Sequence, residues 1–256
     1  MLNLLRAEWT KMRYNIPYGV VILVTALFVY WYSGNRFGDT ASWKTDFMTL
    51  YWGEFVFKNT MGDAGLTTLI TIFLTPLLIG SEFSGRTLND AVYAGHSRLR
   101  IFTVKLLFFY LATCLVSILY PVISILRYSR EWLQSLPPAE AAAYIWRCLG
   151  MHVLLDMALV YLCLIVVFAC RDVIRSVAYS LVLTLALSFI FRLVRSLAPE
   201  TWLSKLIQLY PAYQMKAVME PQVEGSAIGM AVITGLFFIS ASIVISYWLF
   251  RRADLD

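Results

Sequence analysis

The feature that most constrains this chain is a series of six apolar runs that are nearly free of charge. They cover residues 14–35, 64–80, 106–126, 148–170, 176–191 and 226–250. A helix of about 20 apolar residues matches the roughly 30 Å hydrocarbon core of a bilayer. We therefore predict an all-α membrane protein, with residues 1–256 forming a single transmembrane domain of six spanning helices.

The composition excludes a soluble globular protein. Hydrophobic residues make up 60% of the chain and charged residues only 14%, against about 45–50% and about 25% in ordinary soluble domains. The net charge of +5 comes from small groups of Lys and Arg at the ends of the apolar runs. Such a distribution fits lipid headgroups rather than the concentrated basic patch of a nucleic-acid-binding protein, so we expect no nucleic-acid partner.

The segment before the first run has the pattern of an amphipathic helix that lies in the headgroup plane. Leu2, Leu5, Trp9 and Met12 recur at helical spacing within residues 1–13. A signal peptide is the competing interpretation. The run that follows is about 20 residues long and lacks a small-x-small cleavage site, which favours an uncleaved anchor.

The distribution of basic residues predicts the orientation of the chain. Lys and Arg are denser before the first run and after the second, fourth and sixth runs than in the other connections. By the positive-inside rule, both termini are expected in the cytoplasm of a cell whose cytoplasmic membrane holds the chain.

Three segments deviate from a plain alternation of spans and loops. The run 176–191 is short, which suggests local thinning of the membrane or snorkelling of Arg192. Residues 36–63 are rich in aromatic side chains, as is typical of the membrane interface. Residues 193–225 are too short and too charged to span, and we expect one or two short outer helices there, broken at Pro211.

No catalytic, cofactor-binding or metal-binding pattern is present in the sequence. It has no G-x-x-x-x-G-K-[ST] loop, no H-E-x-x-H and no G-x-S-x-G. Its two histidines, His96 and His152, are expected far apart, and its four cysteines form no CxxC pair. We therefore expect a chain that is not itself an enzyme.

Asp156 is a carboxylate inside an apolar run, where a charge costs roughly 2.5–3.5 kcal/mol to insert. Two interpretations remain open. Asp156 is either a polar contact in a substrate cavity, or a hydrated residue near the outer surface that pairs with a partner such as Arg192 or Arg195.

The most informative connection is GSEFSGRTLNDAVYAGHSRLRIFTVK, residues 80–105. Thr87 and Asp90 have the spacing of a capping box, and Gly95 is a plausible C-terminal stop, so a helix of about two turns is expected between them. This helix either lies on the lipid surface or is a protruding helix that another protein binds.

The segment resembles the corresponding stretch of type-2 ABC exporter permeases. Its residue pattern NDAVYAGHSR is most similar to the branch that exports bacitracin, lantibiotics and other amphipathic peptides. The amphipathic N-terminal helix, the six spans and the outer helices also fit that family. Arg86 is a departure, since many members have Gly and Thr adjacent at this point. The matching residues are Glu82, Gly85, Thr87, Gly95, Ser97, Arg98 and Lys105.

The resemblance implies a permease that pairs with a second permease, expected to be a second copy, and with two separate ATPase subunits that hold ATP and Mg. Residues 84–95 would be the coupling helix that docks on the ATPase. Leu88, Ala91 and Val92 would supply the buried contact with Arg86, Asp90 and Arg98 at its rim, and Glu82 and Arg98 would tie the helix to the bundle.

The expected substrate is an amphipathic peptide or another antimicrobial compound. Phe28 and Trp31 in the aromatic-rich first run, together with Asp156, are the candidates for its path. Two other classes remain open. One is a secondary transporter or channel, although neither an inverted repeat nor paired intramembrane charges are seen. The other is a non-transporting membrane anchor or immunity component.

Overall fold

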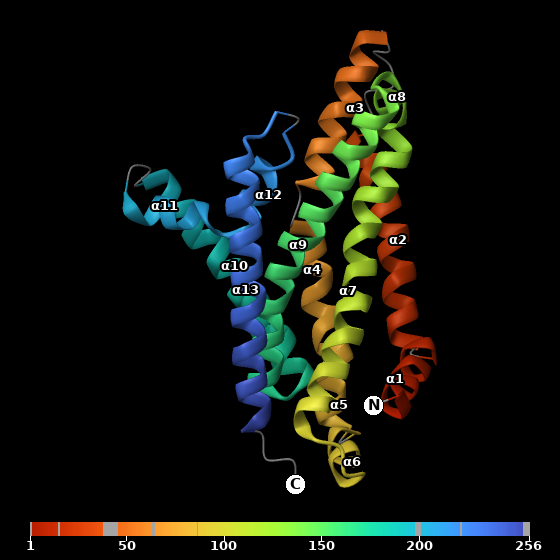
Figure 1. Cartoon of the computed structure of the whole chain (residues 1–256), viewed down its shortest axis with the longest axis vertical. Coiled ribbons are helices and arrows are strands. Elements are labelled where there is room, and N and C mark those ends of the chain that lie inside the picture. Colours follow the sequence, from red (N-terminus) through yellow and green to blue (C-terminus); the bar gives the residue numbers. More distant parts are fainter. Residues whose placement is uncertain are drawn as a thin grey trace.

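The computed structural model describes residues 2–14, 16–37, 46–62, 65–85, 87–197, 201–220 and 222–252. Within these ranges every regular element is a helix, which confirms the all-α prediction (Figure 1). The elements in chain order are α1 (Leu2–Tyr14), α2 (Ile16–Phe37), α3 (Asp46–Met61), α4 (Gly65–Thr75), the π-helical turn η2 (Pro76–Gly80), α5 (Ser81–Ser84), α6 (Thr87–Tyr93), α7 (Arg98–Tyr128), α8 (Arg130–Ser135), α9 (Pro138–Cys170), α10 (Val173–Leu197), α11 (Trp202–Gln208), α12 (Pro211–Ala217) and α13 (Gly225–Arg251).

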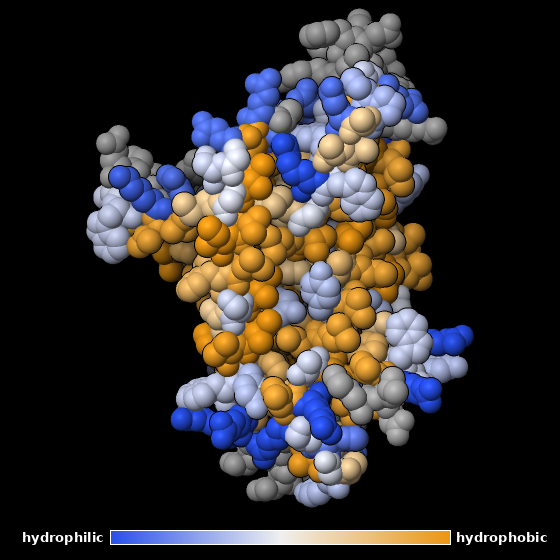
Figure 2. Space-filling model, in the orientation of Figure 1, coloured by the Kyte–Doolittle hydropathy of each residue, from blue (hydrophilic) through white to orange (hydrophobic). Residues whose placement is uncertain are grey.

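Among the described residues, four helices are long and apolar enough to cross a membrane, which confirms a multi-pass membrane protein. They are Arg98–Arg127, Pro138–Cys170, Val173–Phe191 and Gly225–Arg251. The bent pair formed by α1 and α2 brings the number to five if it is counted as one span, and its two axes meet at 53°. Figure 2 shows the corresponding apolar band across the middle of the molecule, between two ends where hydrophilic residues gather.

The predicted second span, residues 64–80, is the one that helix length and apolar character do not confirm. It is divided between α4, with 11 residues, and the five-residue turn η2. Pro76 opens η2, and because proline has no N–H to donate, the regular α-helical bonding cannot continue through it. The helical stretch Thr68–Ser84 runs through Pro76 but is shorter than the other candidates, and six spans stay a prediction.

The prediction that the fifth span is short is wrong. The run 176–191 lies inside α10, a helix of 25 residues. The charged residues that bound the run, such as Arg175, are good helix formers and do not end the helix. Its apolar part, Val173–Phe191, has 19 residues, or about 28 Å at 1.5 Å per residue. No thinning of the bilayer is required.

Helix α9 forms the centre of the bundle, and α13 packs along it through small side chains. Ala231, Gly235, Ser242 and Ser246 of α13 are buried and lie one or two helical turns apart. A Cβ atom placed on Gly235 would lie 3.1 Å from Cγ of Leu154 on α9. Small residues at such intervals let two membrane helices approach closely, where dispersion contacts replace the hydrophobic effect as the source of stability.

At the end of the bundle opposite α6 (Figure 1), short helices close the structure. Two of them, α11 and α12, lie in the region where one or two were expected, and Pro211 is the first residue of α12.

Lys58 on α3 lies 2.9 Å from Glu54 Oε1 and 2.7 Å from Glu220 Oε2. Burial acts to lower the pKa of Lys58, but hydrogen bonds and attraction to the two carboxylates outweigh it and raise the pKa.

Candidate functional site

The short helix predicted between the second and third apolar runs exists as α6, and Gly95 ends it as expected. Gly95 has φ of 81°, which a residue without a Cβ adopts at little cost. Its N–H donates to the carbonyl of Val92 at 2.9 Å, and the N–H of His96 donates to that of Ala91 at 3.3 Å. These two bonds form a Schellman motif, which satisfies carbonyls that the helix end leaves open.

Because this motif depends on a left-handed backbone, we expect Gly95→Ala to destabilise the end of α6 by about 1 kcal/mol. The expected result is faster amide hydrogen exchange confined to α6 and the turn after it. Gly150→Ala on α9 is the matched control, since a Cβ there also meets nothing within 4 Å but the backbone is helical. Equal exchange in α6 of the Gly95→Ala variant and the parent protein would contradict the assignment of the motif.

The predicted capping box is wrong. Thr87 is the first residue of α6 rather than the residue before it, so its backbone is already helical. Its Oγ1 atom is buried and has no hydrogen-bond partner. The threonine therefore leaves a polar atom unsatisfied near the bundle.

The structure also corrects which face of α6 can meet a partner. Leu88 is only 2% exposed and belongs to the chain's own core, and Ala91 and Val92 pack against the same core. Leu88 therefore anchors α6 to the bundle, and Ala91 and Val92, which are partly buried, support it. The outward side of the helix carries Asp90 and Tyr93, the latter 74% exposed.

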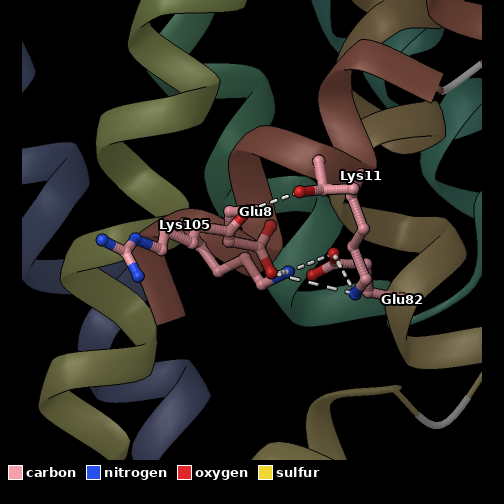
Figure 3. A network of polar contacts seen from close by, with 6 residues as sticks. Glu8, Lys11, Glu82 and Lys105 are labelled. Carbon is pink, nitrogen blue, oxygen red and sulfur yellow. Dashed lines mark hydrogen bonds and ion pairs between the residues drawn. The ribbon is translucent and has the colours of Figure 1, made fainter. Parts of the chain in front are cut away.

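Behind α6, four charged side chains from three helices form a network, hereafter the Lys105 network: Glu8, Lys11, Glu82 and Lys105 (Figure 3). Lys105 on α7 contacts Oε1 of Glu82 on α5, and its Nζ lies 2.6 Å from Oε1 of Glu8 on α1. Lys11 Nζ lies farther away, 3.5 Å from Glu82 Oε1 and 3.8 Å from Glu8 Oε1. The N-terminal helix is thereby tied to both ends of the segment that holds α6.

The carboxyl of Glu82 is in an unusual environment. Burial raises its pKa above the ordinary value, the charge of Lys105 acts in the opposite direction, and the neighbouring Glu8 raises the pKa further. Its Oε1 atom is bonded to the lysines, whereas its Oε2 atom is buried without a hydrogen-bond partner. One oxygen of this carboxyl is therefore both shielded from solvent and unmatched by a hydrogen-bond donor.

The other residues of the predicted coupling segment have local roles. Gly85 ends α5, and its N–H donates to Ser81 O at 2.8 Å. Arg98 Nη1 donates to the carbonyl of Arg251 at 2.6 Å, so it ties the start of α7 to the end of α13. Glu82 and Arg98 were expected to attach the helix to the bundle together. They instead make separate contacts, Glu82 with the lysines and Arg98 with the end of α13. Arg86 lies outside the described residues.

The predicted substrate path is not assembled within the chain. Asp156 is completely buried and accepts a hydrogen bond from Ser117 Oγ on α7, so it is not a hydrated residue near the surface. Phe28 and Trp31 form a ring pair with centroids 6.0 Å apart on the exposed side of α2. The side chains of Arg192 and Arg195, named as possible partners of Asp156, lie outside the described part of the structure.

His152 joins Asp156 in a buried polar cluster that sequence reasoning did not identify. Its Nδ1 lies 2.7 Å from the carbonyl oxygen of Met61, at the end of α3, and its Nε2 lies 3.3 Å from that of Ser117. Its ring therefore bridges two backbone carbonyls from different helices. Helical spacing between His152 and Asp156 was the available signal.

No family model matches the chain, and a comparison with curated proteins finds no match. In the described part of the chain, no three His, Cys, Asp or Glu side chains come together as they would to hold a metal ion. The site is accordingly defined by its geometry. It is a short helix with an exposed outer side, anchored inward by Leu88 and backed by the Lys105 network.

Proposed function

We propose that the chain is the permease subunit of an ATP-driven exporter, in which α6 is the contact with a separate ATPase subunit. The observation that carries this proposal is the division of α6 into two sides. Leu88 fixes it to the bundle, while Asp90 and Tyr93 face outward at the extreme end of the molecule (Figure 1). To transmit movement, α6 needs a rigid attachment to the bundle on one side and an exposed surface for the partner on the other.

The Lys105 network supports the same proposal. A force applied to α6 acts on α5 and α7, which flank it in the chain, and the network joins both of them to α1. Ion pairs that are mostly buried hold their geometry better than exposed ones because they are screened less by solvent. Movement of α6 would therefore be passed to several helices at once.

The ends of the chain support an even number of crossings. Helix α1 and the end of α13 lie at the same end of the molecule as α6 (Figure 1). With the shortened α4–η2 segment as an additional crossing, the count is six. On this proposal α1, α6 and the end of α13 face the cytoplasm of a cell whose cytoplasmic membrane holds the protein, and two copies form the permease. The cargo is an amphipathic peptide or a similar compound.

The test is co-expression of the tagged chain with any ATP-binding protein whose reading frame adjoins its own, followed by purification and measurement of ATP hydrolysis. We expect copurification of the two proteins. The double variant Asp90→Lys, Tyr93→Ala should weaken the complex by about tenfold or more, as loss of interface anchor residues does. Arg175→Ala is the matched control, an exposed residue in the first turn of α10, and should leave the complex unchanged.

Membrane insertion of the double variant should equal that of the parent, because both side chains are exposed. A complex that is unaffected by the double variant would remove α6 from the interface. Purification of the chain as an oligomer without any ATP-binding subunit would instead favour the channel.

A further inference from the structure

Two backbone carbonyls inside the bundle need hydrogen-bond donors from outside their own helices. Pro121 lies inside α7, and because proline has no N–H, the carbonyl four residues earlier, that of Ser117, loses its regular helical donor. Met61 is the last residue of α3, and the final carbonyls of a helix have no partner within it. In the apolar interior of a membrane protein, other parts of the protein must satisfy such groups.

His152 on α9 meets both carbonyls. Its Nδ1 lies 2.7 Å from Met61 O, and its Nε2 lies 3.3 Å from Ser117 O. A carbonyl oxygen only accepts hydrogen bonds, so each ring nitrogen satisfies its carbonyl only if it carries a proton. A neutral imidazole has one N–H and an imidazolium has two. The two contacts together therefore require the cationic form of the ring.

The surroundings supply the matching negative charge. Asp156 lies one helical turn after His152 on α9, and both side chains are fully buried. The carboxylate accepts a hydrogen bond from Ser117 Oγ, so Ser117 contacts the histidine through its carbonyl and the aspartate through its hydroxyl. The C-terminal end of α3 adds a partial negative charge beside Nδ1. An imidazolium and a carboxylate form a neutral pair, and pairing is how charges are accommodated in a membrane interior.

The other titratable groups on the neighbouring helices do not replace Asp156 as the counter-ion. Lys58 on α3 is paired with Glu54 and Glu220, and Lys216 on α12 is exposed. Helix α4 and η2 hold no titratable side chain, and α13 has them only in its last two turns. The rest are thiols and phenols rather than carboxylates: Cys114 and Tyr120 on α7, Cys148 on α9 and Tyr213 on α12.

We propose that His152 binds a second proton and is a cation inside the bundle at neutral pH, with Asp156 as its counter-ion. The charged ring then joins three helices, because it holds the end of α3 and the carbonyl freed by Pro121 on α7 against α9. The inference does not depend on the export function.

The test is solid-state ¹⁵N nuclear magnetic resonance of the full chain in lipid vesicles, with ¹⁵N-labelled histidine. The chain has two histidines, so in the variant His96→Gln every ring signal belongs to His152. We expect both ring nitrogens to carry a proton at about pH 7.5, where an ordinary histidine is mostly neutral. One protonated and one bare nitrogen would overturn the proposal.

Asp156→Asn, made in the same background, tests the counter-ion because it removes the charge and keeps the shape. Without the carboxylate a cation would be buried alone, which is strongly unfavourable, so we expect His152 to become neutral at the same pH. Asp172→Asn is the matched control, since it removes one negative charge at the turn between α9 and α10, and should leave both protons in place. A doubly protonated His152 in Asp156→Asn would exclude Asp156 as the counter-ion.

Pro121→Ala tests the freed carbonyl and should fold at least as well as the parent, because alanine is the better helix former. It restores an N–H that can donate to Ser117 O within α7. Across a pH series, the ratio of doubly protonated to neutral His152 should fall about tenfold, as expected for the loss of one hydrogen bond from a charged donor. Pro76→Ala is the control, since Pro76 lies in η2, away from both carbonyls that His152 contacts in the chain. An unchanged ratio in Pro121→Ala would contradict the role of the freed carbonyl.

Discussion

Replacing Lys105 with methionine is expected to lower the free energy of unfolding by about 3 kcal/mol, the magnitude seen when one partner of a buried ion pair is removed. Lys105 contacts two carboxylates, on Glu8 and Glu82, and the side chains of all three are only 10–12% exposed. Methionine keeps the length of the side chain but leaves both acids without their closest cation. Reversible unfolding of the purified chain in micelles measures the effect.

Lys11→Met is the matched control. Lys11 belongs to the same network, but its side chain is 48% exposed and its ion-pair distances are 3.5 Å and 3.8 Å. Exposed pairs contribute about 0–1 kcal/mol, so this variant should lose less than 1 kcal/mol. Equal losses in the two variants would show that Lys105 is not the centre of the network.

The deficit of Lys105→Met should grow with pH. Without the lysine, burial and the repulsion of Glu8 raise the pKa of Glu82 further above its ordinary value of 4.5. The folded variant then holds a proton that the unfolded chain releases, so its stability falls as the pH rises from about 4.5 through the folded-state pKa. Unfolding at pH 5 and pH 8 should show the larger difference from the parent at pH 8.

The second large effect is expected at the contact between α9 and α13. Gly235→Leu places a side chain where even a Cβ lies 3.1 Å from Leu154 Cγ, so the two helices must separate. Overpacking of this kind typically costs about 1–3 kcal/mol, and we expect the upper end because the small residues of α13 lose their close contact along its length. The unfolding experiment used for Lys105 measures this loss.

Gly229→Leu provides the control on the same helix, since a Cβ at Gly229 meets nothing within 4 Å. That variant should be as stable as the parent or slightly more stable, because leucine is a better helix former than glycine by about 0.5–1 kcal/mol. If Gly235→Leu behaved like Gly229→Leu, the close approach of α9 and α13 would not be what holds them together.

The helical class of the fold could be predicted because apolar runs of membrane length leave few alternatives. The run 148–170 predicts the core of α9 well, although the helix begins earlier, at Pro138. The run 64–80 is not confirmed as a full span; Pro76 changes the hydrogen bonding within it, an effect that hydropathy does not measure. The run 176–191 underestimates the length of α10, because arginines end an apolar run without ending a helix.

The candidate site was predictable only in part. Gly95 could be identified because its role is local, in one turn of backbone. The inward position of Leu88 and the pairing of Glu8 with Lys105 are contacts between distant segments, which spacing along the chain cannot show. The isolated lysine inside an apolar helix was the available signal, since a buried charge requires partners.

The most direct test of α6 as the ATPase contact is a photo-crosslinking residue placed at Tyr93, in inverted and right-side-out membrane vesicles from the cells in which the chain is native. We expect a crosslink to an ATP-binding protein, and access to position 93 by a water-soluble probe only in inverted vesicles. Labelling from the outside, or crosslinks to lipid alone, would contradict this assignment, because α6 would then lack the cytoplasmic protein that must move it.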